Sequence, residues 1–217
     1  MENMENYEKN NDELAAEVTE TAAEEDEKKG GWKKEAMDWI QAIVIALVVS
    51  FLLKNYVLTL AKVQGESMEP TLQNEDRLYV NKLGYTPKKG DVIIFRPATD
   101  PKRPYIKRVI ATEGDTVYID FETSEVYLNG ELLDEPYINE DTRLIGSYIE
   151  SKILRGEYDK EHPIVVEKGK IFVMGDNRNH STDSREIGQV SVDSIIGHAI
   201  FRFWPMGSIG SLESSNK

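Results

Sequence analysis

The sequence predicts a mostly β protein, a partly closed antiparallel β-structure carried on a single N-terminal transmembrane helix. Three observations predict this class. The run from Trp39 to Leu53 contains no charged residue, and a helix needs about 20 apolar residues to cross a bilayer. Beyond residue 61, short β-rich runs alternate with turns that contain Gly or Asp. That part of the chain has no helical pattern of comparable length.

Composition narrows the function classes. The 217 residues suffice for one domain and an appendage. With 26 Lys and Arg against 39 Asp and Glu, the net charge is −13, which argues against nucleic acid as a partner. The absence of cysteine excludes disulfides, thiolate zinc sites and a cysteine nucleophile. The 3 histidines form no spaced metal-binding pair, so we expect no metal and no cofactor.

Residues 1–35 predict a disordered acidic tail. Asp, Glu, Asn and Lys dominate it, and Tyr7 is the one aromatic residue before Trp32. Such a composition cannot bury enough apolar surface to offset the entropy lost on ordering.

Residues 36–60 predict the transmembrane helix, provided that Lys54 extends to the far interface. Trp39 and Tyr56 stand near its ends, as interfacial aromatic residues do. Lysines at 28, 29, 33 and 34 precede it, and by the positive-inside rule they place the N-terminus in the cytoplasm. We therefore expect a single-pass type II protein of the cell membrane. A core helix of a soluble protein would carry polar residues at helical spacing along its length, and this segment lacks that pattern. The long acidic leader argues against a cleaved signal peptide.

Residues 61–207 predict the extracytoplasmic β-domain, and residues 208–217 a flexible C-terminal tail. The expected strands are the β-rich runs at 77–81, 91–96, 105–110, 116–120, 125–128, 131–133, 170–174 and 195–203. The pair Asn129-Gly130 is typical of a hairpin turn. The polar stretch Asn139–Glu161 predicts an irregular excursion.

Two adjacent cations, Lys107 and Arg108, interrupt the β-rich run 105–110. Because neighbouring residues in a strand point to opposite faces, one of these cations must lie among apolar side chains. Burial lowers the pKa of a lysine toward neutrality, whereas arginine stays protonated. A neutral amine is a competent general base, so the candidate base is Lys107. The residues alone also allow a solvated lysine on the strand surface.

A serine and a polar segment accompany this lysine. Without cysteine, Ser67 in the run 65–72 is the candidate nucleophile, although its spacing fits neither the Gly-x-Ser-x-Gly nor the Ser-x-x-Lys motif and also fits a turn serine. In the segment 175–188, Ser181 could orient a lysine amine. The charged residues of that segment could lock a loop through ion pairs, or form a charged surface turn; they are Asp176, Arg178, Asp183 and Arg185.

Taken together and in this order, the three segments resemble the type I signal peptidases. The resemblance spans about residues 36–205, includes the single preceding membrane helix, and looks like the compact form of Gram-positive bacteria. The residues that carry it are Gly65-Glu-Ser67-Met68-Glu-Pro70-Thr71, Lys107-Arg108-Val-Ile with Gly114-Asp115, and Gly175-Asp-Asn-Arg178 with Ser181, Asp183, Ser184 and Arg185.

The resemblance implies a role for each matching residue. Ser67 would be the nucleophile, Lys107 the general base, and Ser181 the residue that holds the lysine amine. The remaining implied residues are Asp183, Arg185, Asp176 and Arg178 as supports, and Met68, Tyr105 and Ile106 as substrate-binding residues. Some members carry a hydroxyl residue where this chain has Gly65, so the oxyanion would depend on backbone N–H groups, including that of Ser67. The implied fold is the one shared with self-cleaving SOS-type repressors.

The expected function is that of a membrane-anchored serine endopeptidase without a cofactor. It would remove N-terminal signal peptides from exported preproteins after small, Ala-x-Ala-like residues. The expected partners are signal peptides and the lipid bilayer, and we expect a monomer. Two alternatives remain open at this point: a Ser/Lys peptidase dedicated to one substrate class, and a non-catalytic membrane-anchored β-module for surface assembly.

Overall fold

The computed structural model describes residues 35–51, 57–143 and 145–212. The chain divides into two compact units, Met1–Leu53 and Lys54–Lys217, and each is described by itself. Residues 1–34 of the predicted acidic tail lie outside the described residues, as do residues 213–217 of the predicted C-terminal tail.

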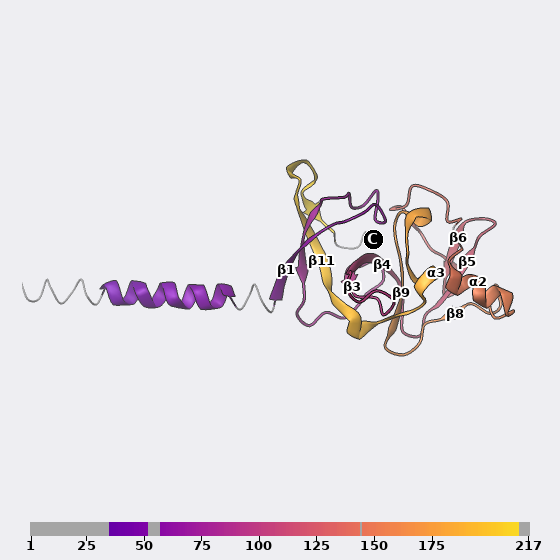
Figure 1. Cartoon of the computed structure of the whole chain (residues 1–217), viewed down its shortest axis with the longest axis horizontal. Coiled ribbons are helices and arrows are strands. Elements are labelled where there is room, and N and C mark those ends of the chain that lie inside the picture. The colour runs from indigo at the N-terminus through magenta and orange to yellow at the C-terminus, as the bar shows by residue number, and fades with distance from the viewer. Residues whose placement is uncertain (1–34, 52–56, 144, 213–217) are drawn as a thin grey trace, which may run out of the picture. The chain divides into compact units, whose positions relative to one another are not determined.

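The first unit contains one described helix, residues 35–51, drawn in violet in Figure 1. Apolar side chains such as Trp39 and Leu47 are exposed along it. Among the described residues, no helix combines the length and the hydropathy needed to cross a bilayer. The membrane span therefore stays a prediction.

The second unit begins with β1, Leu58–Lys62, which corrects the predicted end of the membrane helix at residue 60. Thr59 and its neighbours pair antiparallel with β2, Arg77–Asn81, in the register Thr59 to Val80. Exposed and half-buried residues alternate along β1. This period of two is typical of a strand with one face toward a core. The strand was not predicted because residues 56–60 are mostly apolar and were assigned to the membrane helix.

The larger sheet of this unit has eight antiparallel strands and is curled (Figure 1). Its order is β1-β2-β11-β3-β4-β9-β10, with β12 paired to β11. The remaining strands of the sheet are β3 (Val92–Phe95), β4 (Tyr105–Thr112), β9 (Lys170–Met174), β10 (Val190–Ser191), β11 (Ile195–Trp204) and β12 (Gly210–Ser211). Mostly β structure is therefore confirmed.

A smaller antiparallel sheet has four strands in the order β7-β6-β5-β8. They are β5 (Thr116–Asp120), β6 (Glu125–Leu128), β7 (Glu131–Leu132) and β8 (Ile164–Val165). The predicted hairpin joins β6 to β7, and both of its turn residues have positive φ, 55° at Asn129 and 82° at Gly130. A type I′ turn requires positive φ at both central residues, which explains the Asn-Gly pair.

Strand β4 lies in the middle of the larger sheet and contributes to the cores on both of its faces. Val109 packs with Ile93 and Val173 in one cluster. Ile110 packs with residues of the smaller sheet, including Val117, in another. Side chains in the middle of β4 are therefore removed from solvent on both faces of the strand.

Two expectations for the irregular regions were wrong. The predicted excursion 139–161 contains an α-helix, α2 (Ser147–Leu154), which buries Ile149 and contacts the short helix α3 (Ser184–Ile187). A helix of eight residues with one fully buried side chain gives little periodic signal in the sequence. The predicted flexible tail 208–217 contains β12, whose Gly210 pairs with Arg202 of β11.

Candidate active site

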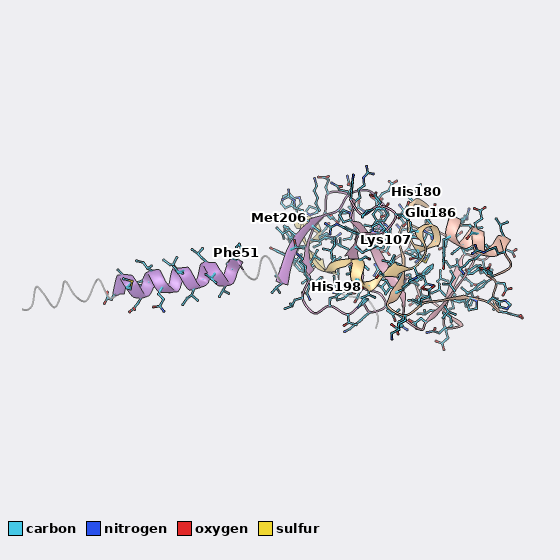
Figure 2. The ribbon with its side chains drawn as sticks, turned by 60° about the horizontal axis from the view of Figure 1, so that its bottom comes forward. Phe51, Lys107, His180, Glu186, His198 and Met206 are labelled. Carbon is cyan, nitrogen blue, oxygen red and sulfur yellow. The ribbon has the colours of Figure 1, made fainter. Side chains whose placement is uncertain are left out.

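Strand β4 places Lys107 in the interior of the β-rich unit (Figure 2). Lys107 is 4% exposed and lies opposite Ile93 of β3. Its neighbour Arg108 is also 4% exposed, on the other face of the strand. Both cations of the pair are therefore buried, where sequence reasoning required only one.

Lys107 meets Ser67 inside the unit. A hydrogen bond of 2.7 Å joins Lys107 Nζ and Ser67 Oγ, and Nζ also donates to the carbonyl oxygen of Ile106 at 2.9 Å. Burial lowers the pKa of Lys107 to about 8, although the negative charges of Asp183 and Asp176 oppose that shift. A substantial fraction of the amine is therefore neutral at mildly alkaline pH, next to a hydroxyl group.

Ser67 lies in the connection between β1 and β2, where the chain turns at Gly65. Gly65 has φ of +87°, a conformation that favours glycine. The N–H of Gly65 donates to Asn74 Oδ1 at 3.0 Å, which ties the two ends of the connection together. Met68, the residue after the serine, is only 2% exposed and packs with Val63 and other apolar residues.

A cleft of about 710 Å³ opens beside the Ser67–Lys107 pair. One wall is formed by β1 and the residues that lead to Met68, and the other by the segment that enters β4. The three predicted substrate-binding residues, Met68, Tyr105 and Ile106, all line it. Ile94, Ile196, His180 and Thr182 also line the cleft. Sequence reasoning assigned none of these four residues to the site, and no spacing signal singled them out.

Residues 175–177 hold the backbone on both sides of Ser67. The N–H of Asn177 donates to the carbonyl oxygen of Ser67 at 3.1 Å, and Asn177 Nδ2 donates to that of Glu66 at 3.1 Å. A Cβ on Gly175 would overlap the Ser67 carbonyl oxygen and Ser181 Oγ. The glycine is therefore needed because the two chain segments touch there.

Ser181 has a different partner from the expected one. Its hydroxyl donates to Asp183 Oδ2 at 2.7 Å, and among the described residues no hydrogen bond joins Ser181 to Lys107. Asp183 also accepts hydrogen bonds from the Gly175 N–H and from the Arg185 guanidinium. Although burial acts to raise it, the pKa of Asp183 lies below its usual value because Arg185 stabilises the carboxylate.

The other two predicted supports have partners outside the segment 175–188. Asp176 accepts two hydrogen bonds from Arg108, at 2.8 and 2.6 Å. Arg178 pairs with Glu135. Sequence reasoning named Arg108 only as the neighbour of Lys107, although the adjacent cations of β4 were a signal that could have identified it. It did not single out Glu135, to which no spacing pointed.

Comparisons with known proteins identify the family. A family model described as "Signal peptidase, peptidase S26" matches residues 36–204. The chain belongs to this signal peptidase family. Its members include "Signal peptidase IB" of Staphylococcus aureus (strain Mu50 / ATCC 700699), which is 38% identical over 179 residues, or 80% of this chain and 92% of the relative. "Signal peptidase I P" of Bacillus subtilis subsp. natto is 38% identical over 181 residues, or 82% of this chain and 94% of that relative.

A crystal structure of a signal peptidase I from Enterococcus faecalis V583 also matches. It is 26% identical, covers 52% of this chain and 97% of that chain, and gives a TM-score of 0.38. Membership of the signal peptidase family makes this protein a serine endopeptidase, a hydrolase.

Replacing Gly175 with alanine should impair this peptidase while it stays folded. The added Cβ would displace Ser181 or the Ser67 backbone, and a misplacement of about 1 Å near the reacting atoms costs about 100-fold in rate. We therefore expect kcat/KM for peptide cleavage to fall about 100-fold.

Gly207→Ala is the matched control, because a Cβ at Gly207 meets no atom within 4 Å. Circular dichroism of both variants checks that they fold. Equal activity of the two variants would show that the contact between Gly175 and Ser67 is unimportant.

Proposed function

We propose that this protein removes N-terminal signal peptides from exported preproteins by a Ser67/Lys107 dyad, cutting after small, Ala-x-Ala-like residues. The observation that carries the proposal is the 2.7 Å contact between Ser67 Oγ and a buried lysine amine at the side of an open cleft. The names of the S. aureus and B. subtilis relatives, both signal peptidases, support it.

Ser67 is the nucleophile in this mechanism and Lys107 the general base. The neutral amine takes the hydroxyl proton as Ser67 Oγ attacks the scissile carbonyl carbon. The protonated amine then gives that proton to the leaving amino group, and an acyl-enzyme remains. Lys107 next takes a proton from a water molecule as its oxygen attacks the ester carbonyl. The C–Oγ bond then breaks, Lys107 returns the proton to Ser67 Oγ, and the new carboxyl end is released with the dyad restored.

Backbone N–H groups stabilise the oxyanion of both tetrahedral intermediates. Within the part of the chain that the structure describes, no hydrogen bond uses the Ser67 N–H, and the adjacent Glu66 and Ser67 carbonyls are fixed by Asn177. This arrangement supports Ser67 N–H as one donor of the oxyanion hole. Ser181, Asp183 and Arg185, with Asp176 and Arg178 behind them, are the supporting residues of the dyad.

The substrate binds in the cleft as an extended peptide, and Met68, Tyr105 and Ile106 contact it. The consecutive residues from Thr59 to Met68 line the cleft, which supports the binding of an extended segment of the substrate alongside them. The fold is the signal-peptidase type. We further propose that the protein is a monomer, anchored by the span that begins at about residue 36, with residues 61–207 outside the cytoplasm. The anchor keeps the site near substrates that are themselves held in the bilayer.

Cleavage by the full-length protein in detergent tests the proposal. Ser67→Ala should lower kcat for a peptide with an Ala-x-Ala junction by at least about 1,000-fold, because the acyl-enzyme cannot form. Ser194→Ala is the matched control and should keep full activity, since among the described residues the Ser194 hydroxyl bonds only to the Ser191 carbonyl oxygen. Replacing the final Ala of the peptide by Phe should abolish cleavage.

The outcomes separate the alternatives. Activity retained by Ser67→Ala would contradict the dyad and favour a non-catalytic module or another nucleophile. Cleavage that depends on Ser67 but ignores the Ala-x-Ala junction would contradict the proposed specificity and favour a peptidase dedicated to another substrate class.

A further inference from the structure

The buried charges around the site do not balance within the segment 175–188. Three arginines are buried around the site: Arg108 on β4, and Arg178 and Arg185 in the segment. The segment supplies only two buried carboxylates, Asp176 and Asp183. Asp176 pairs with Arg108, and Asp183 pairs with Arg185. A buried guanidinium without a counter-charge is strongly unfavourable, so Arg178 needs a carboxylate from elsewhere.

Glu135, which follows β7 of the smaller sheet, supplies that carboxylate. Arg178 NH1 donates to Glu135 Oε2 at 2.9 Å, and Arg178 NH2 donates to Glu135 Oε1. The side chains are 0% and 7% exposed respectively. Thr142 Oγ1 accepts a third hydrogen bond, from NH1 at 3.0 Å. The connection after β7 thus contributes a carboxylate that forms a bidentate ion pair in the support of the site.

Tyr137 connects the same pair to the second arginine. Its hydroxyl donates to Glu135 Oε1 at 2.9 Å, and its ring lies over the Arg108 guanidinium, 4.1 Å from the ring centroid. Burial and the charge of Glu135 raise the pKa of Tyr137, so it remains a donor. Glu135 therefore contacts Arg178, and Tyr137 contacts both Glu135 and Arg108.

Arg178 transmits this support to the dyad through two backbone contacts. Its Nε donates to the Gly175 carbonyl oxygen at 3.0 Å, and Gly175 in turn packs on Ser67 and donates its N–H to Asp183. The Arg178 carbonyl oxygen accepts from Arg185 NH2 at 2.6 Å. A shift of Arg178 would therefore move Gly175 and Asp183, the two neighbours that fix Ser67 and act on Lys107.

We propose that Glu135 is a positioning residue for the proposed peptidase reaction: it neutralises and holds Arg178 so that Gly175 keeps its place against Ser67 and Asp183 keeps its charge available to Arg185 and Lys107. The inference rests on the proposed function of the Ser67–Lys107 pair. It also gives the connection after β7 a role in the reaction, since that connection carries Glu135.

Loss of the Glu135 charge has a predictable electrostatic consequence. In Glu135→Gln, Arg178 becomes an uncompensated cation that attracts Asp183, and less negative potential remains at Lys107. The pKa of Lys107 should then fall below its present value of about 8, which burial sets against the opposing charges of Asp183 and Asp176. The titratable and charged groups around Lys107 are Tyr105 on its own strand, Asp176, Asp183 and Arg185 behind it, and Lys62, Glu66, Lys102, Arg103 and His180 along the cleft.

The pH dependence of kcat and kcat/KM for the Ala-x-Ala peptide, measured with full-length protein in detergent, tests this role. For Glu135→Gln we expect kcat at its plateau to fall about tenfold, KM to change little, and the acid limb of kcat/KM to move down by about half a pH unit. The matched control is Glu131→Gln, which removes the same charge from an exposed position on β7. It should leave both quantities unchanged.

The double variant Glu135→Met with Arg178→Met removes both charges. We expect its kcat to stay low, because Gly175 has lost the Arg178 donor, while its acid limb returns to the wild-type position. Thermal melting shows which variants fold. If Glu135→Gln does not fold, the double variant decides, and wild-type kcat in that protein would overturn the proposal.

The remaining outcomes distinguish this inference from the proposed function. A Glu135→Gln protein that is less stable but has the kcat and acid limb of Glu131→Gln overturns the positioning role and leaves the dyad intact. If Ser67→Ala remains active or the wild type has no acid limb near pH 8, the proposed function itself fails, and the inference fails with it.

Discussion

Replacing Lys107 with methionine should lower kcat/KM by about 1,000-fold or more, because Ser67 then has no group to take its proton. Lys107→Arg should be equally impaired. Arginine keeps the positive charge but stays protonated, so it cannot act as a base. Both losses should appear in kcat. Lys107→Met should leave the fold in place, because methionine fits a buried apolar position, and thermal melting shows whether Lys107→Arg folds. Cleavage of the Ala-x-Ala peptide measures both losses.

The matched control for this prediction is Lys168→Met, which removes a lysine at an exposed position. It should cleave at the wild-type rate. Near-wild-type activity in Lys107→Arg would contradict the general-base role, because a permanently charged side chain would then suffice.

Replacing Asp183 with alanine should lower the free energy of unfolding by about 3–5 kcal/mol, because it leaves the Arg185 charge buried without its partner. Asp183 is fully buried, and it accepts hydrogen bonds from Ser181 and the Gly175 N–H as well as from Arg185. Urea unfolding followed by tryptophan fluorescence measures the loss. The same substitution removes the main negative charge near Lys107, so the acid limb of kcat/KM should also move to lower pH.

Two further variants check the cause. Asp134→Ala, at an exposed position, should change the stability by less than about 0.5 kcal/mol. Adding Arg185→Met to Asp183→Ala should recover part of the lost stability, because no unpaired charge remains. A loss below about 1 kcal/mol in Asp183→Ala would show that the pair is not the support described here.

Much of the larger sheet could be predicted from local pattern alone. The runs 77–81 and 170–174 coincide with β2 and β9 because their β-branched and aromatic residues lie between turn residues. The Asn129-Gly130 turn has the positive φ angles that its residues favour. Weaker local signals were missed, namely β1 within an apolar run, the short helix α2, and the two-residue strand β12.

The site divides along similar lines. The cation pair at Lys107 and Arg108 indicated burial, since side chains alternate along a strand, and the structure buries both. The contact between Ser67 and Lys107 was predicted from the resemblance to a family, because two residues 40 positions apart carry no local signal of their proximity. The pairing of Arg178 with Glu135 could not be predicted, since no local pattern links two residues that are 43 positions apart.

The proposed mechanism requires an uncharged amine at Lys107 at mildly alkaline pH, and titration of that amine tests the mechanism most directly. The ¹³Cε resonance of Lys107 in the full-length protein, assigned by its loss in Lys107→Met, can be followed by NMR as the pH is raised. We expect a midpoint near pH 8, the value set by burial. A midpoint at the ordinary lysine value, near 10.5, would mean that the amine is charged at the pH of the reaction and would contradict the proposed mechanism.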